Sequence, residues 1–286
     1  MEFFSPFVEF GFMRRALVGC LALSLGGTPV GVFMLLRRMS LMGDAMSHAI
    51  LPGAALGYLF FGLSLTAMTV GGLIAGLLVV LMAGFVTRSS RLKEEANLAA
   101  FYLISMALGV LIISLKGRNA DLLQVLFGGV LALDDSALVL MAGIATVSVV
   151  SLAVLLRPLV LECADPAFLR SMGRSGEWAY YIFLMLVVMN LVAGFHAMGT
   201  LMAVGLMILP AIAARLWTQR LGMLLALASG LAVLSSVAGL LLSYHADLPA
   251  GAAIILCAGV LYIASFLLAP AGLLRRFWPV RTHLRA

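Results

Sequence analysis

Asp44 and His48 lie four residues apart in a stretch, Leu41 to Phe61, that is otherwise almost wholly apolar. Residues four apart on an α-helix face the same way, so both side chains project to one place. A carboxylate beside an imidazole can do three things there. It can lock helices together as a hydrogen-bonded pair, relay protons through the histidine, or bind a divalent metal such as Zn²⁺, Mn²⁺ or Fe²⁺. The residues alone leave all three readings open.

The depth of this pair in a membrane makes it costly. Arg37 and Arg38 precede the apolar stretch and mark its membrane edge. With a helical rise of 1.5 Å per residue, Asp44 lies about 9 Å and His48 about 15 Å beyond Arg38, near the middle of a ~30 Å hydrocarbon core. A central Asp costs about 2.5–3.5 kcal/mol and usually faces a bundle interior or a water-filled path. Two ligands hold a metal weakly, which suits a site that must release its cargo.

Further ligands can be sought in three places. Ser47 lies three residues from Asp44 in the sequence. Asn190 and His196 lie six residues apart in a later apolar stretch and so do not share a helical face; the first is read as a hydrogen-bonding link between helices and the second as an ordinary histidine or a contact near the outer side. His245 and Asp247 fall in a predicted outer loop, where they can receive a cation, although a turn explains Asp247 equally well.

The composition predicts an all-α integral membrane protein. Of the 286 residues, 64% are hydrophobic and 10% are charged, with a mean hydropathy of +1.16, whereas soluble domains carry about 25% charged residues. We expect one transmembrane domain, residues 1–286, forming a polytopic helical bundle of about 8–9 transmembrane helices, and a short shallow or re-entrant helix at 127–133. The candidate spans are 16–36, 41–61, 65–86, 96–115, 137–156, 179–198, 200–216, 221–243 and 250–268.

Charge sets the expected orientation. The basic clusters near 37–38, 88–93, 157–174, 215–220 and 275–285 fall on one side of the alternating spans, which should be the cytoplasm, and this places the C-terminus inside. Arg14 and Arg15 conflict with the outer position of the N-terminus that follows. The net charge of +6 is therefore a topology signal and does not indicate nucleic-acid binding.

Several chemistries find no support in the sequence. The two lysines, Lys93 and Lys116, do not form a GxxxxGK[ST] loop, so any use of ATP must come from a partner. We find neither GxSxG nor HExxH, and the three cysteines form no CxxC pair. The chain is expected to be a transport subunit and not an enzyme. Glycine pairs such as Gly53 and Gly57 are expected to form small faces for close helix packing.

Four segments resemble one known family. "LRRMSLMGDAMSHAILPGAALGYL" resembles the permease subunit of the ABC importers for zinc, manganese and iron, whose second helix carries GDxxxHA. "LLQVLFGGVLAL", "MGTLMAVGLMILPAIAARL" and "SYHADLPAGAAIIL" resemble later blocks of the same family, in the same order. The resemblance covers nearly the whole chain, from about residue 14 to residue 268.

The resemblance implies a type II, cobalamin-importer-like permease in the bacterial inner membrane. It implies a pair of permeases, two cytoplasmic ATP-binding subunits and an extracytoplasmic metal-binding protein. It also implies that Asp44 and His48 line the metal path, with no cofactor beyond the transported ion. The ATPase contact is expected in a cytoplasmic loop at about 157–178, because "CADPAFLRSMGRSGEW" resembles the family's DPxxAxxxG segment; a solvated basic loop is the alternative. The coupling residues expected there are Asp165, Pro166, Phe168, Leu169, Arg170 and Gly173.

The sequence therefore predicts the permease of an ATP-driven importer of a divalent metal. Zinc is favoured slightly, with manganese next, because the apolar spans contain His196 and no carboxylate besides Asp44. The alternative is a proton-coupled secondary transporter that uses Asp44 and His48 as a proton relay, although such carriers often show internal repeats and none is visible here. A membrane-embedded enzyme is a more distant alternative.

Overall fold

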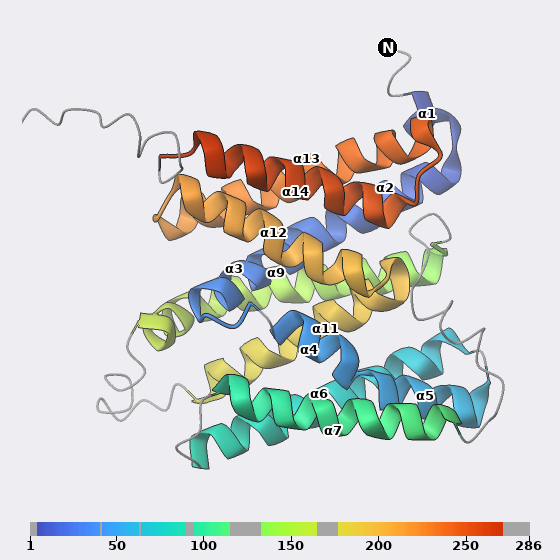
Figure 1. The fold of residues 1–286 in the computed structure, drawn as a ribbon, viewed down its shortest axis with the longest axis vertical. Coiled ribbons are helices and arrows are strands. Elements are labelled where there is room, and N and C mark those ends of the chain that lie inside the picture. The colour runs from blue at the N-terminus through green and yellow to red at the C-terminus, as the bar shows by residue number, and fades with distance from the viewer. Residues whose placement is uncertain are drawn as a thin grey trace, which may run out of the picture.

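The computed structural model describes residues 5–40, 42–62, 64–89, 94–114, 133–164 and 177–270, and within these ranges the regular structure is all helical. In Figure 1, α12, α13 and α14 lie at one end of the long axis and α5, α6 and α7 at the other, with α3, α4, α9 and α11 between them. The elements are α1 (Ser5–Glu9), α2 (Gly11–Ala22), the π-helical η2 (Leu23–Gly27), α3 (Thr28–Leu36), α4 (Met42–Ala49), α5 (Leu51–Phe61), α6 (Leu65–Ser89), α7 (Glu94–Ser114), α9 (Asp135–Ala164), α11 (Glu177–Met198), α12 (Thr200–Trp217), α13 (Leu221–Ala246) and α14 (Ala250–Leu268).

Seven helical stretches in the described part of the chain are long and apolar enough to cross a membrane. They coincide with seven of the expected spans, the first being the continuous Gly11–Leu36 formed by α2, η2 and α3. The expected fourth span is α7, whose apolar part, Ala96–Ile112, is shorter. The prediction of a polytopic helical bundle is therefore confirmed.

The second expected span is not one helix. It is divided at Ile50 into the short helices α4 and α5, so the prediction of an unbroken span from 41 to 61 is wrong. Pro52 explains the break, because proline has no N–H to donate to the carbonyl four residues earlier and its ring collides with that carbonyl. The carbonyl in question belongs to His48.

Helix α9 is longer than expected at its C-terminal end. The sequence predicts that this span ends at 156 and that a cytoplasmic loop begins at about 157, but α9 continues to Ala164. Leu155 and Leu159 are both buried, so the apolar face of the helix continues against the core past Pro158. The segment between α9 and α11 is therefore 165–176, which lies outside the described residues, as do residues 127–132 of the expected helix at 127–133.

The N-terminal end of α9 is stabilised by two hydrogen bonds to Asp134 and by an ion pair of Asp135. Asp134 accepts hydrogen bonds from the Ser136 hydroxyl (2.6 Å) and the Ala137 N–H (2.9 Å), and these lower the pKa of its carboxyl below 3.8. Arg15 of α2 pairs with Asp135, with 3.0 Å between Nε and Oδ1. One of the two arginines that conflict with the expected topology, Arg15, is thus paired with an acidic neighbour.

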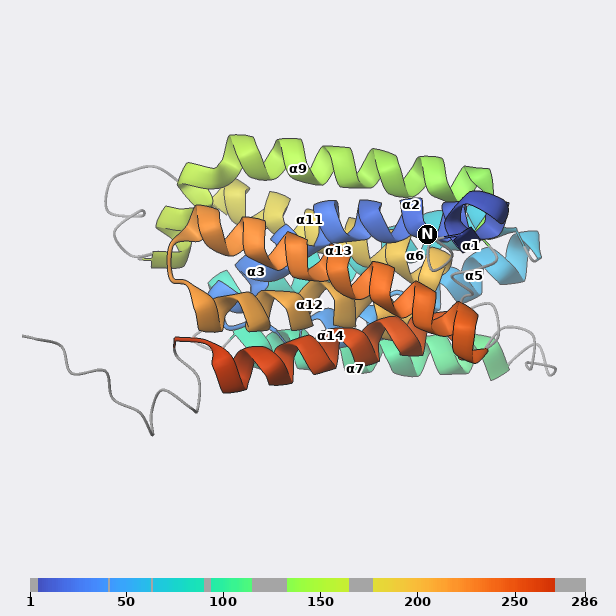
Figure 2. The same cartoon turned by 90° about the horizontal axis from the view of Figure 1, so that it is seen from above.

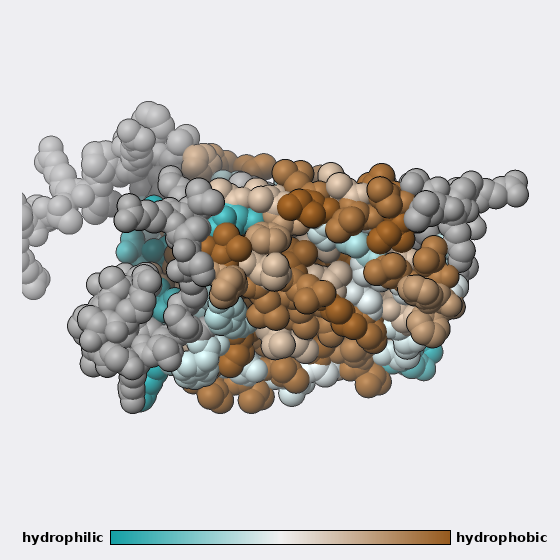
Figure 3. All heavy atoms as spheres, turned by 90° about the horizontal axis from the view of Figure 1, so that it is seen from below, coloured by the Kyte–Doolittle hydropathy of each residue, from teal (hydrophilic) through white to brown (hydrophobic). Residues whose placement is uncertain are grey.

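Apolar side chains cover the central part of the molecular surface. Large apolar side chains are exposed along α6, α7, α9 and α14, and Figure 3 shows hydrophobic residues covering the central part of one face, with hydrophilic residues gathered toward its two ends. Figures 1 and 2 place the end of α3 and the α12–α13 connection at one end of the bundle and α1 with the α13–α14 connection at the other. This arrangement is that of a multi-pass membrane protein.

Candidate functional site

Helix α4 carries both Asp44 and His48. The Asp44 side chain is exposed and the His48 side chain is half-buried, although both lie on a helix whose other face is packed in the bundle. Gly43 lets the packed face of α4 approach α12, because a Cβ on Gly43 would lie 3.1 Å from Val204 and 3.3 Å from Ile208. The short helix is thus pressed against α12, and Asp44 is directed away from the packed core.

Asp44 opens onto a cavity of about 250 Å³ between α4 and α7. Tyr102 of α7 lines the same cavity and offers the polar group that the sequence analysis did not single out, a phenolic hydroxyl. Met39 and Met42 contribute thioether side chains to the lining, which is completed by Ala45, Leu98 and Ala99. Nothing in the spacing of Tyr102 relates it to Asp44, since the two residues meet only when α7 packs beside α4.

The break after α4 adds backbone acceptors beside His48. Pro52 leaves the His48 carbonyl without the donor that a continuous helix would supply. The neighbouring carbonyl of Ala49 accepts a hydrogen bond from the Ser105 hydroxyl of α7, at 2.8 Å. The C-terminal end of a short membrane helix presents partial negative charge, and such ends coordinate cations in transporters with broken helices. One helix, α4, therefore carries the Asp44 carboxylate, the His48 imidazole and the carbonyl groups at its own C-terminal end.

Ser47 has a local role in the structure. Its hydroxyl donates a hydrogen bond of 2.6 Å to the carbonyl of Asp44, and its side chain is buried while that of Asp44 is exposed. The bond stabilises the turn of α4 between the two candidate ligands. A direct contact of Ser47 with a cation stays a prediction.

Asn190 lies away from the Asp44 cavity and links two helices. Its amide nitrogen donates to the Ser148 hydroxyl of α9 at 2.6 Å and to the Leu186 carbonyl at 2.8 Å, and the side chain is buried. This geometry favours the reading of Asn190 as a link between α9 and α11. His196 belongs to α11, but its side chain lies outside the described residues, as do the whole of Asp165, Pro166, Phe168, Leu169, Arg170 and Gly173.

His245 and Asp247 line a common hollow of about 690 Å³ at the end of α13, together with Phe12 and Tyr244. The Nδ1 atom of His245 lies 2.9 Å from the Leu241 carbonyl, and Asp247 ends the helix in the left-handed conformation (φ 50°). Both side chains are exposed. The two residues share one opening, and their role in receiving a cation stays a prediction.

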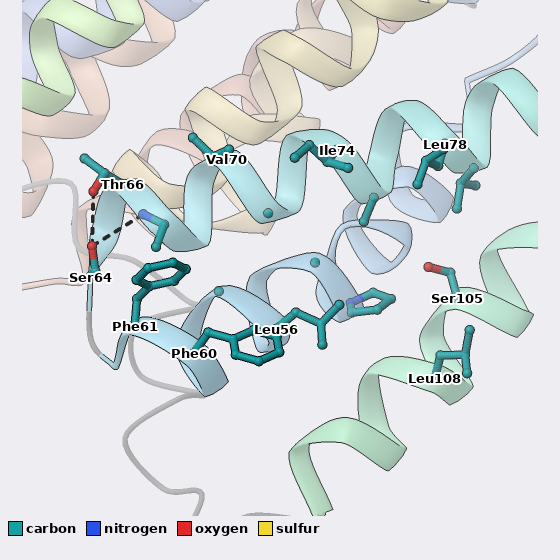
Figure 4. Close-up of a pocket in the computed structure, with 17 residues that line it drawn as sticks. Leu56, Phe60, Phe61, Ser64, Thr66, Val70, Ile74, Leu78, Ser105 and Leu108 are labelled. Atoms are coloured by element: carbon teal, nitrogen blue, oxygen red, sulfur yellow. Dashed lines mark hydrogen bonds between the residues drawn. The ribbon is translucent and has the colours of Figure 1, made fainter.

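A larger hollow of about 790 Å³ lies between α5, α6 and α7, and it has a different chemistry. Figure 4 shows Leu56, Phe60, Phe61, Val70, Ile74 and Leu78 along it. Its few polar groups are hydroxyls such as Ser64 and Thr66, which hydrogen-bond to each other at 3.1 Å. A cation would find no charged ligand there, so its size does not make it the functional site.

The cation site of a single chain is incomplete. Within the ranges that the structure describes, no group of three or more His, Cys, Asp or Glu side chains lies close enough together to hold a metal ion. Asp44 and His48 would supply only two side-chain ligands, and a metal bound by proteins commonly takes four or more. The remaining ligands must come from backbone, water, Tyr102 or another chain.

A broken membrane helix that carries an acid–imidazole pair beside a cavity is typical of transport permeases. The chain belongs to the ABC 3 transport family, whose pattern matches residues 9–269. It is 32% identical to the manganese import system permease protein ScaB of Streptococcus parasanguinis, over 94% of this chain and 95% of that protein. It is 30% identical to a protein described as a probable iron transport system membrane protein of Haemophilus influenzae, over 90% and 93% of the two chains.

A solved structure has the same fold. The chain is similar to PsaBC from Streptococcus pneumoniae in complex with Fab, with a TM-score of 0.82 and 28% identity, covering 97% of this chain and 99% of that one. The resemblance to the permeases of metal ABC importers is therefore confirmed, and with it the type II architecture and the role of a transport subunit. These comparisons give no support to a proton-coupled secondary transporter.

Proposed function

We propose that this chain forms the membrane path of an ATP-driven importer that carries a divalent transition metal into the cytoplasm, and that manganese is the cargo. The observation that carries the proposal is the pairing of Asp44 and His48 on a short broken helix, with Asp44 open to a cavity. Hard oxygen ligands and one imidazole suit Mn²⁺ and Fe²⁺ as well as Zn²⁺. The manganese and iron systems among the relatives favour manganese, and the lean toward zinc stays a prediction.

The exposure of Asp44 supports pairing with a second copy of the chain. A carboxylate at mid-membrane depth cannot face lipid without a penalty of about 2.5–3.5 kcal/mol or more, so another surface must cover it or enclose water around it. Two copies that meet at α4 would bring together two carboxylates and two imidazoles, so the second copy would supply the two side-chain ligands that one chain lacks for four-fold coordination. Partial coordination by each copy would also allow the ion to be released.

ATP must be used by partner subunits. We place two ATP-binding subunits on the cytoplasmic side, against the segment between α9 and α11 that contains Asp165 to Gly173, and a metal-binding protein at the opposite end near His245 and Asp247. In this arrangement the ion passes from the outer hollow to the Asp44 site and then to the cytoplasm as access alternates. The membrane is the bacterial inner membrane.

Metal accumulation in cells that express the complete transporter tests the proposal. Elemental analysis would compare wild type with Asp44→Ala, Asp44→Asn and His48→Ala at matched membrane levels, with manganese, zinc and iron supplied separately. We expect each variant to lose roughly tenfold or more of the uptake of one metal, because removing a ligand weakens a site at least as much as removing its support. Unchanged uptake in all three variants would contradict the proposal.

Energy coupling separates this proposal from its alternative. In right-side-out membrane vesicles or proteoliposomes loaded with ATP, uptake should persist when a protonophore collapses the proton gradient. Abolition of uptake by the protonophore, at an unchanged ATP level, would favour the proton-coupled carrier.

A further inference from the structure

Arg37 connects the turn before α4 to helix α11. Its guanidinium carbon lies 4.6 Å from the ring centroid of Tyr180 and 5.7 Å from that of Phe183, both on α11. Cations within about 6 Å of an aromatic centroid are attracted to the ring face, most strongly where water is excluded. Phe183 in turn packs edge-on against Phe33 of α3, at 6.4 Å between centroids. We call Arg37, Tyr180 and Phe183 the arginine clamp.

The clamp also lies at the end of a helix that packs against α9. Arg37 caps the C-terminal end of α3, and α3 packs against both α9 and α11. The charges of Arg37 and of the buried Glu162 both act on the Cys163 thiol, near the end of α9. Helix α9 ends at Ala164 and α11 begins at Glu177. The arginine clamp therefore contacts α11 and lies at the end of a helix packed against α9. These two helices border the segment 165–176, for which we have proposed contact with the ATP-binding subunits.

The turn after Arg37 is tightly hydrogen-bonded and leads directly to the candidate cation ligands. The N–H of Arg38 donates to the Leu35 carbonyl (3.0 Å) and that of Met39 to the Met34 carbonyl (2.9 Å), which is the pattern of a Schellman motif. Arg38 occupies its left-handed position at φ 61°. The Met42 N–H then donates to the Met39 carbonyl at 3.0 Å, and Met42 is the first residue of α4. A displacement of Arg37 is thus passed to α4, where Asp44 stands two residues further on.

A cation–aromatic contact can persist between two structural elements that shift against each other. A hydrogen bond weakens steeply when its angle changes, whereas a guanidinium remains attracted to a ring face over a range of positions within about 6 Å. The contact between α11 and the turn can therefore survive a small shift of one helix against the other. It would also hold the turn and α11 together as they move.

We propose that the arginine clamp couples the ATP-driven movement of α9 and α11 to the position of α4, and so to access at Asp44 and His48. Arg37 is in this view a positioning residue that does not touch the ion. The inference rests on the proposed function and deepens it, because it assigns the link between ATP use and the cation site to particular side chains.

The test uses the complete transporter, with its ATP-binding subunits and metal-binding protein, reconstituted in proteoliposomes. The measured quantity is the ratio of manganese taken up to ATP hydrolysed. Tyr180→Phe keeps the aromatic face and Tyr180→Leu removes it, while Arg37→Lys keeps the charge and Arg37→Met removes it. Arg38→Met, at the exposed neighbouring arginine, is the matched control.

We expect the ratio to fall about three- to thirtyfold in Arg37→Met and Tyr180→Leu, while ATP hydrolysis stays within twofold of wild type. Tyr180→Phe and the Arg38→Met control should keep the ratio, and Arg37→Lys should lie between. The thermal unfolding midpoint of each purified permease, measured in parallel, identifies variants that have only lost stability.

Two results would overturn the clamp without touching the proposed function. One is an unchanged ratio in both Arg37→Met and Tyr180→Leu; the other is a parallel fall in uptake and hydrolysis, which indicates a purely structural role. A wild-type transporter with no ATP-dependent uptake of any divalent metal would instead overturn the proposed function and the clamp with it.

Discussion

At the scale of single residues, two polar side chains of the membrane helices have different surroundings: Asp44 opens onto a cavity, whereas Asn190 is buried and hydrogen-bonded between α9 and α11. Asp44 and His48 could be paired because their separation matches the helical repeat, and both do lie on α4. Tyr102 could not be found in this way, since it reaches the cavity from another helix. Asn190 could be weighed from the sequence, and its two hydrogen bonds favour the structural reading.

Replacing Asn190 tests that reading. Asn190→Ala removes the hydrogen bond to Ser148 and should lower the free energy of unfolding in detergent by about 0.6–1.7 kcal/mol, the usual range for hydrogen bonds between membrane helices. Metal uptake at matched membrane levels should stay within twofold of wild type. Ser148→Ala is the matched partner variant, and the double variant should lose less than the sum of the two because one bond is shared. Loss of uptake with unchanged stability would place Asn190 on the ion path instead.

At the scale of elements, glycine allows the second span to bend and still pack closely. Gly53 lies just after the break, and a Cβ at this position would overlap the carbonyl of Gly71 on α6. A Cβ on Gly57 would lie 2.6 Å from the Ala67 carbonyl of the same helix. The expectation that this glycine pair forms a small packing face is therefore confirmed. Helix α5 is held against α6 while α4 turns toward α12, which separates the cation ligands from the apolar half of the span.

Gly53→Ala should therefore destabilise the protein. The added methyl group forces α5 away from α6, and such overpacking typically costs about 1–3 kcal/mol. The thermal unfolding midpoint in detergent measures the effect. Gly230→Ala on α13 is the matched control, because a Cβ there meets nothing within 4 Å. The control should be neutral or slightly stabilising. Equal midpoints for the two variants would show that the close contact of α5 and α6 is not needed.

At the scale of the whole molecule, the charge pattern and the fold agree on which connections between helices lie at the same end of the bundle. The arginine pair after α3 and the α12–α13 connection lie at one end of the bundle, and the acidic start of α9 lies beside α2 near the other. The ion pair of Arg15 with Asp135 weakens the basic signal of Arg14 and Arg15 that opposed this orientation, because a neutralised arginine adds little positive charge at that end.

Accessibility of introduced cysteines tests the orientation. In a chain whose three native cysteines are replaced by alanine, Ala246→Cys and Gln219→Cys place thiols at opposite ends of α13, both at exposed positions. We expect a membrane-impermeant maleimide to label Ala246→Cys from the outer side of the inner membrane and Gln219→Cys only after permeabilisation, since the arginines near Gln219 favour the cytoplasm. The reverse pattern would contradict a cytoplasmic C-terminus.

The sequence by itself determined the properties that depend on neighbouring residues. Composition and apolar run length specify a helical membrane protein and the approximate spans, because each helix satisfies its own backbone hydrogen bonds and must match the hydrocarbon thickness. The four-residue spacing of Asp44 and His48 places both on one helical face for the same reason. Pro52 was visible in the sequence, but a proline in a membrane helix is often tolerated, so the break needed the structure.

Only the tertiary structure decided which helices meet. Helices in a membrane gain little from burying apolar surface against one another, so their neighbours are chosen by close packing and a few polar contacts. Gly43 against α12, Ser105 on the Ala49 carbonyl and Arg37 over Tyr180 each join residues more than 50 positions apart. No local pattern encodes these contacts, yet they orient Asp44 toward its cavity and connect it to α11.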